Sequence, residues 1–196
     1  MIRIFDFIFS LLGIALLSPI FVILSIAIVL DSRGGAFYSQ IRVGKNNTNF
    51  KLYKFRSMSI GADKKGLITV GGRDTRITRV GYFIRKYKLD ELPQLFNVLL
   101  GQMSLVGPRP EVRKYVDQYT LEQKIVLSVK PGITDYASIE YIDENEILSK
   151  STNPDLDYIN IIVPDKIKYN MKYINNRSLK EYFTILFITF FSILKK

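Results

Sequence analysis

The stretch KLDELPQ, residues 88–94, places two neighbouring carboxylates, Asp90 and Glu91, just before a proline in a chain of formal net charge +10. The 196-residue chain contains no cysteine and no histidine. This composition excludes thiol nucleophiles, histidine bases, Ser-His-Asp triads and Cys/His zinc sites. Any chemistry must therefore come from Asp, Glu, Lys, Arg, Tyr, Ser or Thr, with or without a metal bound by oxygen ligands.

Asp90 has three interpretations. It is a helix N-cap if a helix begins there, with Pro93 in the first turn and Gly101 as the terminator. Alternatively, the acidic pair holds Mg²⁺ against a diphosphate that is bound at the helix N-terminus. In the third interpretation, one carboxylate attacks phosphorus, as in aspartyl-phosphate enzymes. A cap needs only one carboxylate, so the presence of Glu91 beside Asp90 favours chemistry.

Arg109 stands between two prolines in MSLVGPRPE, residues 103–111, which we interpret as a short strand that runs into a rigid loop. Pro108 and Pro110 restrict the backbone on both sides of the arginine. A guanidinium fixed in this way suits bidentate phosphate binding. The alternative is a structural turn with an ordinary surface arginine.

The charge is distributed unevenly along the chain. Residues 33–88 contain 14 Lys and Arg against two acids, whereas residues 135–165 contain eight acids against one Lys. The first block predicts an anion-binding region, and the second predicts a solvated flank. The anion is a nucleic acid, an anionic lipid headgroup or a small phosphorylated substrate. A merely soluble basic surface remains the alternative.

Between the chain ends the pattern predicts mixed α and β structure. Residues 36–43 and 49–56 alternate partly and read as two strands joined by the turn-rich KNNT. VGGRD, residues 70–74, predicts a loop, and residues 76–88 predict a basic amphipathic helix. The chain has no P-loop and no GxGxxG motif, so the nucleotide-binding folds built on those loops are unsupported.

Residues 7–30 form an uncharged apolar segment of 24 residues, long enough to enter a bilayer. A signal peptide fits poorly because the run is long, Asp6 precedes it and no A-x-A site follows. Ser18-Pro19 at its middle allows either a kinked spanning helix or a helix-break-helix that returns to the same side. The Lys and Arg residues that follow place the main domain in the cytoplasm. Arg3 and Asp6 are expected to lie in water or among headgroups.

The chain ends in a second apolar segment, Tyr182–Leu194, closed by Lys195-Lys196. This run is too short to span a bilayer. It predicts either an interfacial helix with lysines at the headgroups or a buried core helix.

Three stretches carry a family resemblance: YKFRSM (53–58), the long run 75–111, and KPGIT (130–134). They resemble the bacterial sugar transferase family, the monotopic polyprenyl-phosphate phosphoglycosyl transferases, here in the minimal-domain form. The resemblance covers nearly the whole chain, and the middle run is highly specific.

The resemblance implies an α+β fold with a compact cytoplasmic catalytic domain of short strands and interfacial helices. It divides the chain into a re-entrant membrane helix (1–32), the phosphoglycosyl transferase domain (33–177) and an amphipathic membrane-interface helix (178–196). In the family, the Ser-Pro pair, here Ser18-Pro19, breaks the membrane helix so that it returns to the cytoplasmic face.

The activity implied is the transfer of sugar-1-phosphate from a UDP-sugar to undecaprenyl phosphate with release of UMP. Asp90 corresponds to the family's nucleophile, which forms a covalent phosphosugar-aspartate, and Glu91 assists. The two carboxylates are also the candidate ligands of the required Mg²⁺. The residues implied to bind substrate phosphate are Arg85, Arg109, Lys54 and Arg56.

The implied setting is the cytoplasmic face of the bacterial inner membrane, at the first membrane step of glycan assembly. The partners are the UDP-sugar, undecaprenyl phosphate and membrane lipids, without nucleic acid. Downstream glycosyltransferases or a second copy of the chain are candidate protein partners. The rival interpretations are a membrane-anchored nucleic-acid-binding protein and a noncatalytic scaffold for glycan enzymes.

Two positions depart from the family pattern. After KPGIT many members continue with G-x-A-Q and an N-G-R segment, whereas this chain reads DYASIEYIDEN, residues 135–145. That region bears on nucleotide-sugar binding, so the resemblance does not extend to the identity of the sugar. Many relatives also carry an Asp at the position of Asn170, and Asp165 is the nearby candidate for its role.

Overall fold

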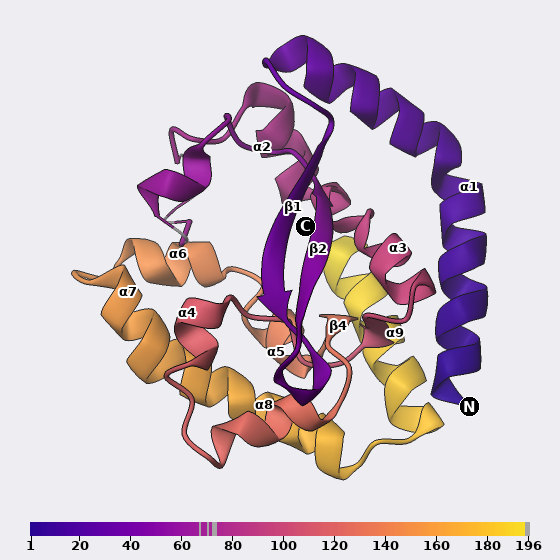
Figure 1. Ribbon diagram of the computed structural model, residues 1–196, viewed down its shortest axis with the longest axis vertical. Coiled ribbons are helices and arrows are strands. Elements are labelled where there is room, and N and C mark those ends of the chain that lie inside the picture. Colours follow the sequence, from indigo (N-terminus) through magenta and orange to yellow (C-terminus); the bar gives the residue numbers. More distant parts are fainter. Residues whose placement is uncertain (67, 70, 72–73, 195–196) are drawn as a thin grey trace.

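The computed structural model describes residues 1–66, 68–69, 71 and 74–194, and it has the mixed α+β fold that the sequence predicts (Figure 1). The helices are α1 (Ile2–Asp31), α2 (Arg79–Lys86), α3 (Gln94–Leu99), α4 (Arg113–Val116), α5 (Tyr136–Glu140), α6 (Glu144–Ser149), α7 (Pro154–Asp157), α8 (Val163–Asn175) and α9 (Leu179–Leu194). The strands are β1 (Phe37–Val43), β2 (Asn49–Phe55), β3 (Ser104–Val106) and β4 (Gly132–Thr134).

The two predicted strands form an antiparallel hairpin, with β1 paired to β2 from Phe37↔Phe55 to Val43↔Asn49. The KNNT turn closes it, and Asn46 adopts a left-handed conformation (φ 55°) that asparagine tolerates better than most residues. In Figure 1 the hairpin crosses the middle of the molecule. Its second strand, β2, carries Lys54, a residue of the site described below.

The second sheet joins the two family-like stretches around PRP and KPGIT. β3 pairs in parallel with β4, with Ser104 opposite Gly132. Gly107 and Gly132 approach so closely that a Cβ on Gly132 would lie 2.1 Å from the Gly107 nitrogen, which excludes any side chain there. This contact fixes the start of the loop that carries Arg109.

The predicted helix at 76–88 is present as the shorter α2. Its N-cap is Thr78, whose Oγ1 accepts a hydrogen bond from the Gly81 nitrogen at 2.9 Å. The helix ends at Lys86, and Lys88 turns the chain with a left-handed backbone (φ 56°). That sharp turn separates α2 from the acidic pair.

The N-cap interpretation of Asp90 is wrong. Leu89–Glu91 forms a 3₁₀ turn, and α3 begins only at Gln94, with Pro93 before it and no side-chain cap at either start. Gly101, the predicted terminator, does follow α3 with φ 82°. Asp90 is therefore not occupied in closing a helix end.

The N-terminal apolar segment forms one helix, α1, which runs through Pro19 without interruption and curves around one side of the molecule in Figure 1. Among the described residues it is the one helix long and apolar enough to cross a membrane by length and composition. Pro19 lacks the N–H that would bond the Ala15 carbonyl, and the Ser18 hydroxyl donates to that same oxygen at 2.8 Å. The serine thus supplies the donor that the proline removes.

The expectation that Asp6 lies in water or headgroups is wrong, and Arg3, although only half-buried, is also bonded within the protein. Asp6 is only 2% exposed, and its Oδ1 accepts hydrogen bonds from Ser104 Oγ, the Leu105 nitrogen and Tyr182 OH, each at 2.9 Å. Arg3 donates to the carbonyls that end α3, including Leu99 O at 2.8 Å. These side chains are satisfied inside the protein because they tie the start of α1 to α3, β3 and α9.

The C-terminal segment forms α9, which has the features of both predicted alternatives. Tyr182 and Ile185 are fully buried in the main core, whereas Phe187 and Phe190 are 65% and 60% exposed. Phe183 packs edge-on against Phe5 of α1 at 5.3 Å between ring centroids. One face of α9 is therefore core, and the other is free to contact an apolar surface.

Two of the sequence-based predictions fall outside the described residues. The predicted loop at 70–74 includes Val70, Gly72 and Arg73, and the predicted headgroup lysines are Lys195 and Lys196.

The acidic stretch 135–165 is folded, and four of its eight acids are exposed while only Asp135 is buried. The predicted solvated flank is therefore present for most of these carboxylates but not for Asp135. The stretch folds into α5, α6, α7 and a π-helical turn at Tyr158–Ile162 that leads into α8. Asp135 is 0% exposed and caps α5 by accepting from the Ser138 nitrogen at 2.6 Å. These short helices form one wall of the cavity described next.

Candidate active site

Asp90 lies in the 3₁₀ turn between α2 and α3 and is 4% exposed. Its carboxylate makes no hydrogen bond or ion pair with any residue that the structure describes. Burial and the neighbouring Glu91 charge raise the pKa of Asp90, although the charges of Lys54 and Arg85 oppose the rise. Asp90 is thus a buried carboxylate, close to cations, with its oxygens left available to a ligand.

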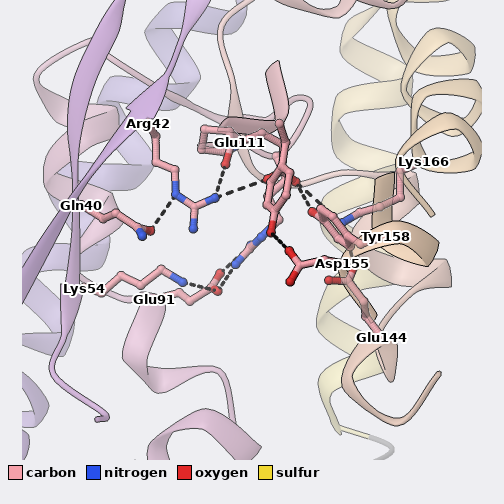
Figure 2. Close-up of polar contacts among 12 residues, drawn as sticks. Gln40, Arg42, Lys54, Glu91, Glu111, Glu144, Asp155, Tyr158 and Lys166 are labelled. Carbon is pink, nitrogen blue, oxygen red and sulfur yellow. Dashed lines mark hydrogen bonds and ion pairs between the residues drawn. The ribbon is translucent and has the colours of Figure 1, made fainter. Parts of the chain in front are cut away.

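Glu91, the next residue, is fully engaged. Its Oε1 accepts from Lys54 Nζ at 3.0 Å and from Arg109 Nη2, and its Oε2 accepts from Arg109 Nη1 at 3.0 Å. Figure 2 shows Lys54 reaching Glu91 from the hairpin. Burial alone would raise the pKa of Glu91, but the charge and hydrogen bonds of Arg109, together with Lys54, hold it well below its ordinary value. Glu91 is therefore ionised and serves as the anchor of two cations.

Arg109 is fixed at both its backbone and its side chain. Its backbone nitrogen donates to Asp135 Oδ2 at 3.2 Å, and its guanidinium forms the bidentate pair with Glu91. That pair raises the pKa of Arg109 above its already high value. The flanking Pro108 and Pro110 add the backbone restriction that the sequence predicts. Because the side chain is still 30% exposed, part of the guanidinium surface remains open to a ligand.

Two cavities meet at Asp90. The larger, of about 490 Å³, extends from the end of α1 along the hairpin, and the smaller, of about 160 Å³, lies over the acidic turn. Asp90, Arg85, Lys54 and Arg109 line both cavities. The fold thus brings together four residues that are spread over 56 positions of the sequence. A carboxylate among three cations is suited to phosphorus chemistry on an anionic substrate.

The larger cavity has a second, charged wall that sequence analysis did not predict (Figure 2). Glu111 accepts from Tyr158 OH at 2.5 Å, and its other oxygen lies 3.5 Å from Arg42 Nη1. Lys166 Nζ donates to Glu144 Oε2 at 2.7 Å. These groups offer both donors and acceptors, which suits the hydroxyl-rich or amide-bearing part of a polar ligand.

The residues that sequence analysis missed come mostly from the acidic stretch. Asp135 positions the Arg109 backbone, and Glu144 and Ser138 line the smaller cavity with Lys166. A signal for Asp135 existed, because an Asp followed three residues later by a polar residue is typical of a helix start. No pattern pointed to Lys166, which reaches the cavity only through the packing of α8.

Arg56, predicted to bind phosphate, lines the larger cavity, but its guanidinium is already engaged by the protein. It is 6% exposed, and all three of its guanidinium nitrogens donate to oxygens at the end of α1 and in the turn after it. The geometry gives no support to a phosphate role for this residue, because no N–H remains free. Ser18 and Pro19 lie in the middle of α1 and do not line the larger cavity.

Neither candidate for the missing family aspartate lies at Asp90. Asp165 accepts from Tyr141 OH at 2.7 Å and from Lys168, and Asn170 is buried in α8. Neither of these two residues lines the cavities that meet at Asp90. The idea that Asp165 takes over a metal-supporting role therefore has no geometric basis in this structure.

A metal at this site would depend on its substrate for ligands. Within the part of the chain that the structure describes, no group of three or more acidic side chains is placed to hold an ion. Asp90 offers a free carboxylate, whereas both oxygens of Glu91 are bound by cations. This donor set fits Mg²⁺, which is commonly held by one or two carboxylates together with substrate phosphates and water. Asp90 is the better-placed of the two predicted ligands.

Comparison with known proteins identifies the family of this chain. The family described as "Bacterial sugar transferase" matches this chain over residues 1–196. The chain belongs to the bacterial sugar transferase family. Its relatives in this family include a Bacillus subtilis (strain 168) protein with 48% identity over 120 residues, covering 61% of this chain and 67% of that protein.

Two longer relatives carry names that state an activity. The Aeromonas hydrophila protein is named a UDP-N-acetylgalactosamine-undecaprenyl-phosphate N-acetylgalactosaminephosphotransferase, with 44% identity over 137 residues, or 68% of this chain and 32% of that protein. The Klebsiella pneumoniae protein is named a UDP-glucose:undecaprenyl-phosphate glucose-1-phosphate transferase, with 38% identity over 193 residues, or 96% of this chain and 39% of that protein. The matched part of the chain thus spans 32% and 39% of the length of these two relatives.

Proposed function

We propose that this protein transfers a sugar-1-phosphate from a UDP-sugar to undecaprenyl phosphate and releases UMP. Family membership and the names of the relatives support the substrate classes. The observation that carries the mechanism is the carboxylate of Asp90, which is buried, unpaired among the described residues and placed where two cavities meet.

The reaction proceeds in two displacements at the same phosphorus. A carboxylate oxygen of Asp90 attacks the phosphorus that bears the sugar, and the bond from that phosphorus to the UMP oxygen breaks with its electron pair leaving on UMP. An oxygen of the lipid phosphate then attacks, and the bond to Asp90 breaks, which restores the carboxylate. Splitting the transfer in this way is the general advantage of covalent catalysis.

The cations around Asp90 provide the electrostatic part of catalysis. Arg109 is the donor best fixed in position, since Glu91 and Asp135 hold it from both ends. Arg85 lines both cavities, and its Nη2 donates to Thr69 Oγ1 at 3.1 Å. Fixed positive groups stabilise charge that develops on the transferring phosphoryl oxygens without having to reorganise first. Bound Mg²⁺, held by Asp90 and substrate phosphates, would neutralise further charge on the diphosphate.

We infer further that α1 is re-entrant, so that it enters and leaves the cytoplasmic leaflet. A straight 30-residue helix would measure about 45 Å, enough to cross a bilayer. Both ends, however, are fastened to one domain: Asp6 bonds Ser104 at the start, and at the end Asp31 Oδ2 accepts from the Val80 nitrogen at 3.0 Å. In the bilayer, an unsatisfied carbonyl beside Pro19 would be costly, and the Ser18 hydroxyl prevents this.

Exposed apolar side chains on several helices support a monotopic setting at the inner membrane, with residues 33–177 in the cytoplasm and 178–196 at the interface. α9 exposes Phe187 and Phe190, and α2 exposes Phe83 at 53% beside basic residues. Aromatic and basic residues together favour the headgroup region of a bilayer.

The decisive experiment is incubation of the purified protein with UDP-sugars and Mg²⁺ in the absence of lipid acceptor. We expect at most one UMP per active site, a mass increase of one sugar-phosphate, and its location on Asp90 by peptide mapping. Asp90→Asn should abolish the adduct and turnover, because an amide is a far poorer nucleophile. Release of UMP only after undecaprenyl phosphate is added, without an adduct, would show direct attack by the lipid. No UMP under any condition would favour the noncatalytic scaffold.

Topology is testable because the chain has no cysteine. Single cysteines introduced at Met1 and at Arg33 should both be shielded from an impermeant thiol reagent in intact cells. Reaction of the Met1 position from outside would show that α1 spans the membrane.

A further inference from the structure

Arg56, which follows β2 directly, forms the densest set of hydrogen bonds to the end of α1. Its donors reach six oxygens, five of them backbone carbonyls: Ile28 O (3.2 Å), Ser32 O (2.8 Å), Arg33 O (2.5 Å), Gly34 O (3.2 Å), Gly35 O (2.7 Å) and Ser32 Oγ (2.9 Å). A guanidinium has five N–H groups in a fixed plane, so every donor of Arg56 is in use.

The end of α1 needs such a partner. Ile28 O is one of the last four carbonyls of α1, which lack an intrahelical donor, and it accepts from both the Ser32 nitrogen and Arg56. The other backbone oxygens that Arg56 reaches belong to residues 32–35, in the turn after the helix, and the helix dipole makes this end negative. The last turn of α1 contains no basic residue of its own. The chain can wrap around the guanidinium because Gly34 adopts φ 119°, and a Cβ there would lie 3.3 Å from Arg56 Nη1. Arg56, the residue after β2, thus supplies a cation to the end of α1 and to the turn that follows it.

The same strand carries a group of the site. Lys54, two residues before Arg56 and within β2, donates to Glu91 at 3.0 Å. Phe55 between them packs against Phe21 of α1 at 5.3 Å between ring centroids. Three consecutive residues therefore connect the membrane helix to the carboxylate beside Asp90.

A second connection runs from the end of α1 to the other side of the site. Asp31, the last residue of α1, accepts from the Val80 nitrogen in the first turn of α2 at 3.0 Å. α2 carries Arg85, which lines both cavities. The end of α1 is therefore connected, through Arg56 and Asp31, to the two elements that carry Lys54 and Arg85 of the site.

We propose that Arg56 is a positioning residue that locks the end of α1 to β2 and so sets the depth of the Asp90 site relative to the bilayer. This inference rests on the proposed function. A UDP-sugar reaches the site from water, so its binding does not depend on the depth of the site in the membrane. A lipid phosphate, in contrast, is confined to the headgroup layer. Loosening the lock should therefore impair the second displacement selectively.

The test compares Arg56→Gln and Arg56→Lys with the unchanged protein in liposomes that contain undecaprenyl phosphate. For Arg56→Gln we expect the KM for the lipid acceptor to rise about ten- to a hundredfold, the range that a small misplacement causes. The UMP burst without acceptor and the KM for the UDP-sugar should stay within about twofold, a change worth less than half a kcal/mol. Arg56→Lys keeps the charge but loses the planar fork, and should be intermediate.

Arg113→Gln is the matched control. Arg113 likewise donates to carbonyl-type oxygens, those of Asn47 and Asn49, but at the far end of the hairpin from α1. Its replacement should leave the KM for the acceptor unchanged. A similar rise there would mean that any loosened hairpin has this effect, and would overturn the proposal.

A second readout is independent of activity. Because the chain has no cysteine, Leu30→Cys would introduce a single one near the end of α1, at a residue that is 81% exposed. This cysteine can be labelled with an environment-sensitive dye. Quenching by lipids with quenchers at known depths should place the dye at a different depth in Arg56→Gln than in the unchanged protein. An identical depth would overturn the proposal.

The remaining outcomes are distinguishable. A smaller UMP burst with unchanged KM values would mean that Arg56 only stabilises the fold, and a raised KM for the UDP-sugar would mean that it binds nucleotide phosphate. Either result overturns the proposal. If the unchanged protein gives no UMP at all, the proposed function fails, and the depth measurement at Leu30 alone decides whether Arg56 locks α1.

Discussion

The ion pair between Glu91 and Arg109 gives the sharpest test of how the site works. Glu91 accepts two hydrogen bonds from the guanidinium, and its side chain is 12% exposed. We interpret Glu91 as the residue that aims Arg109 at the transferring phosphoryl group. Glu91→Gln and Arg109→Gln should then damage the same interaction, and the double variant should be little worse than either single one.

The expected coupling follows from the geometry. A hydrogen bond to a charged group contributes about 1.5–3 kcal/mol, so two of them set an upper limit of about 3–6 kcal/mol. Arg109 is 30% exposed, which lets water replace part of its lost contacts, and Lys54 still pairs with Glu91 at 3.0 Å. We therefore expect a coupling free energy of about 2–3 kcal/mol, which corresponds to about 30- to 150-fold in the rate of adduct formation.

The assay is the rate of the UMP burst without acceptor for the four proteins of the double-mutant cycle, with urea unfolding of each in detergent as the parallel stability measurement. The burial that would raise the pKa of Glu91 is outweighed by Arg109 and Lys54, so its folded pKa lies below its unfolded value of about 4.3. The pair's contribution is then fully present above about pH 4.3 and is lost only as the pH falls through the lower folded pKa. The coupling should therefore be the same at pH 6 and pH 8, both roughly two units or more above that value.

The exposed pair Lys114–Asp155 provides the control cycle. Its side chains are 53% and 58% exposed, and such pairs contribute little because water and salt screen them. Purely multiplicative rate effects in the Glu91–Arg109 cycle would refute the reasoning, since the two residues would then act independently.

Three further outcomes are expected. The charge of Lys54 lowers the pKa of Asp90, so Lys54→Met should raise that pKa further. The acidic limb of the pH profile for the UMP burst should then move to higher pH. An unmoved limb would mean that Asp90 is not the titrating nucleophile. Pro19→Ala restores the missing backbone N–H and should favour a straight, spanning helix, visible as labelling of an N-terminal cysteine from outside. Tyr182→Phe deletes one of three hydrogen bonds to buried Asp6 and should lower the free energy of unfolding by about 1.5–3 kcal/mol in urea titrations. No change would show that this hydrogen bond does not stabilise the fold.

Local chemistry explains which parts of the fold were predictable. The hairpin follows from alternation and an Asn-rich turn, and α3 ends where Gly101 can adopt a positive φ. Both signals act within a few residues and need no distant partner. The helix at 76–88 was right in place but too long, because its true start depends on the Thr78 cap.

The errors share a different cause. Arg3 and Asp6 look solvent-bound in sequence, yet each is satisfied by groups about 95 to 176 positions away. Within the acidic stretch, which is otherwise mostly at the surface, Asp135 is buried and Glu144 pairs with Lys166 only after α8 has packed. A charged side chain is buried at a low free-energy cost only when such partners pair with it. Partners that are distant in the sequence leave no local pattern.

The sequence by itself determined the chemistry available to this protein. Without Cys or His, the acidic pair at Asp90-Glu91, the proline-framed Arg109 and the apolar N-terminal segment already pointed to phosphorus chemistry at a membrane, and the family-like stretches named the reaction class. Residue types and short spacings are enough for this, because nucleophilicity, charge and backbone restriction are local properties.

Only the tertiary structure decided which charged residue does what. Among the described residues it left the Asp90 carboxylate without a partner and bound Glu91 to Arg109, and it engaged Arg56 with Ile28 O of α1 and with oxygens of the turn after that helix. The physical reason is competition for donors: a cation binds whichever oxygens the fold brings within about 3 Å, and that choice is made by packing between distant segments.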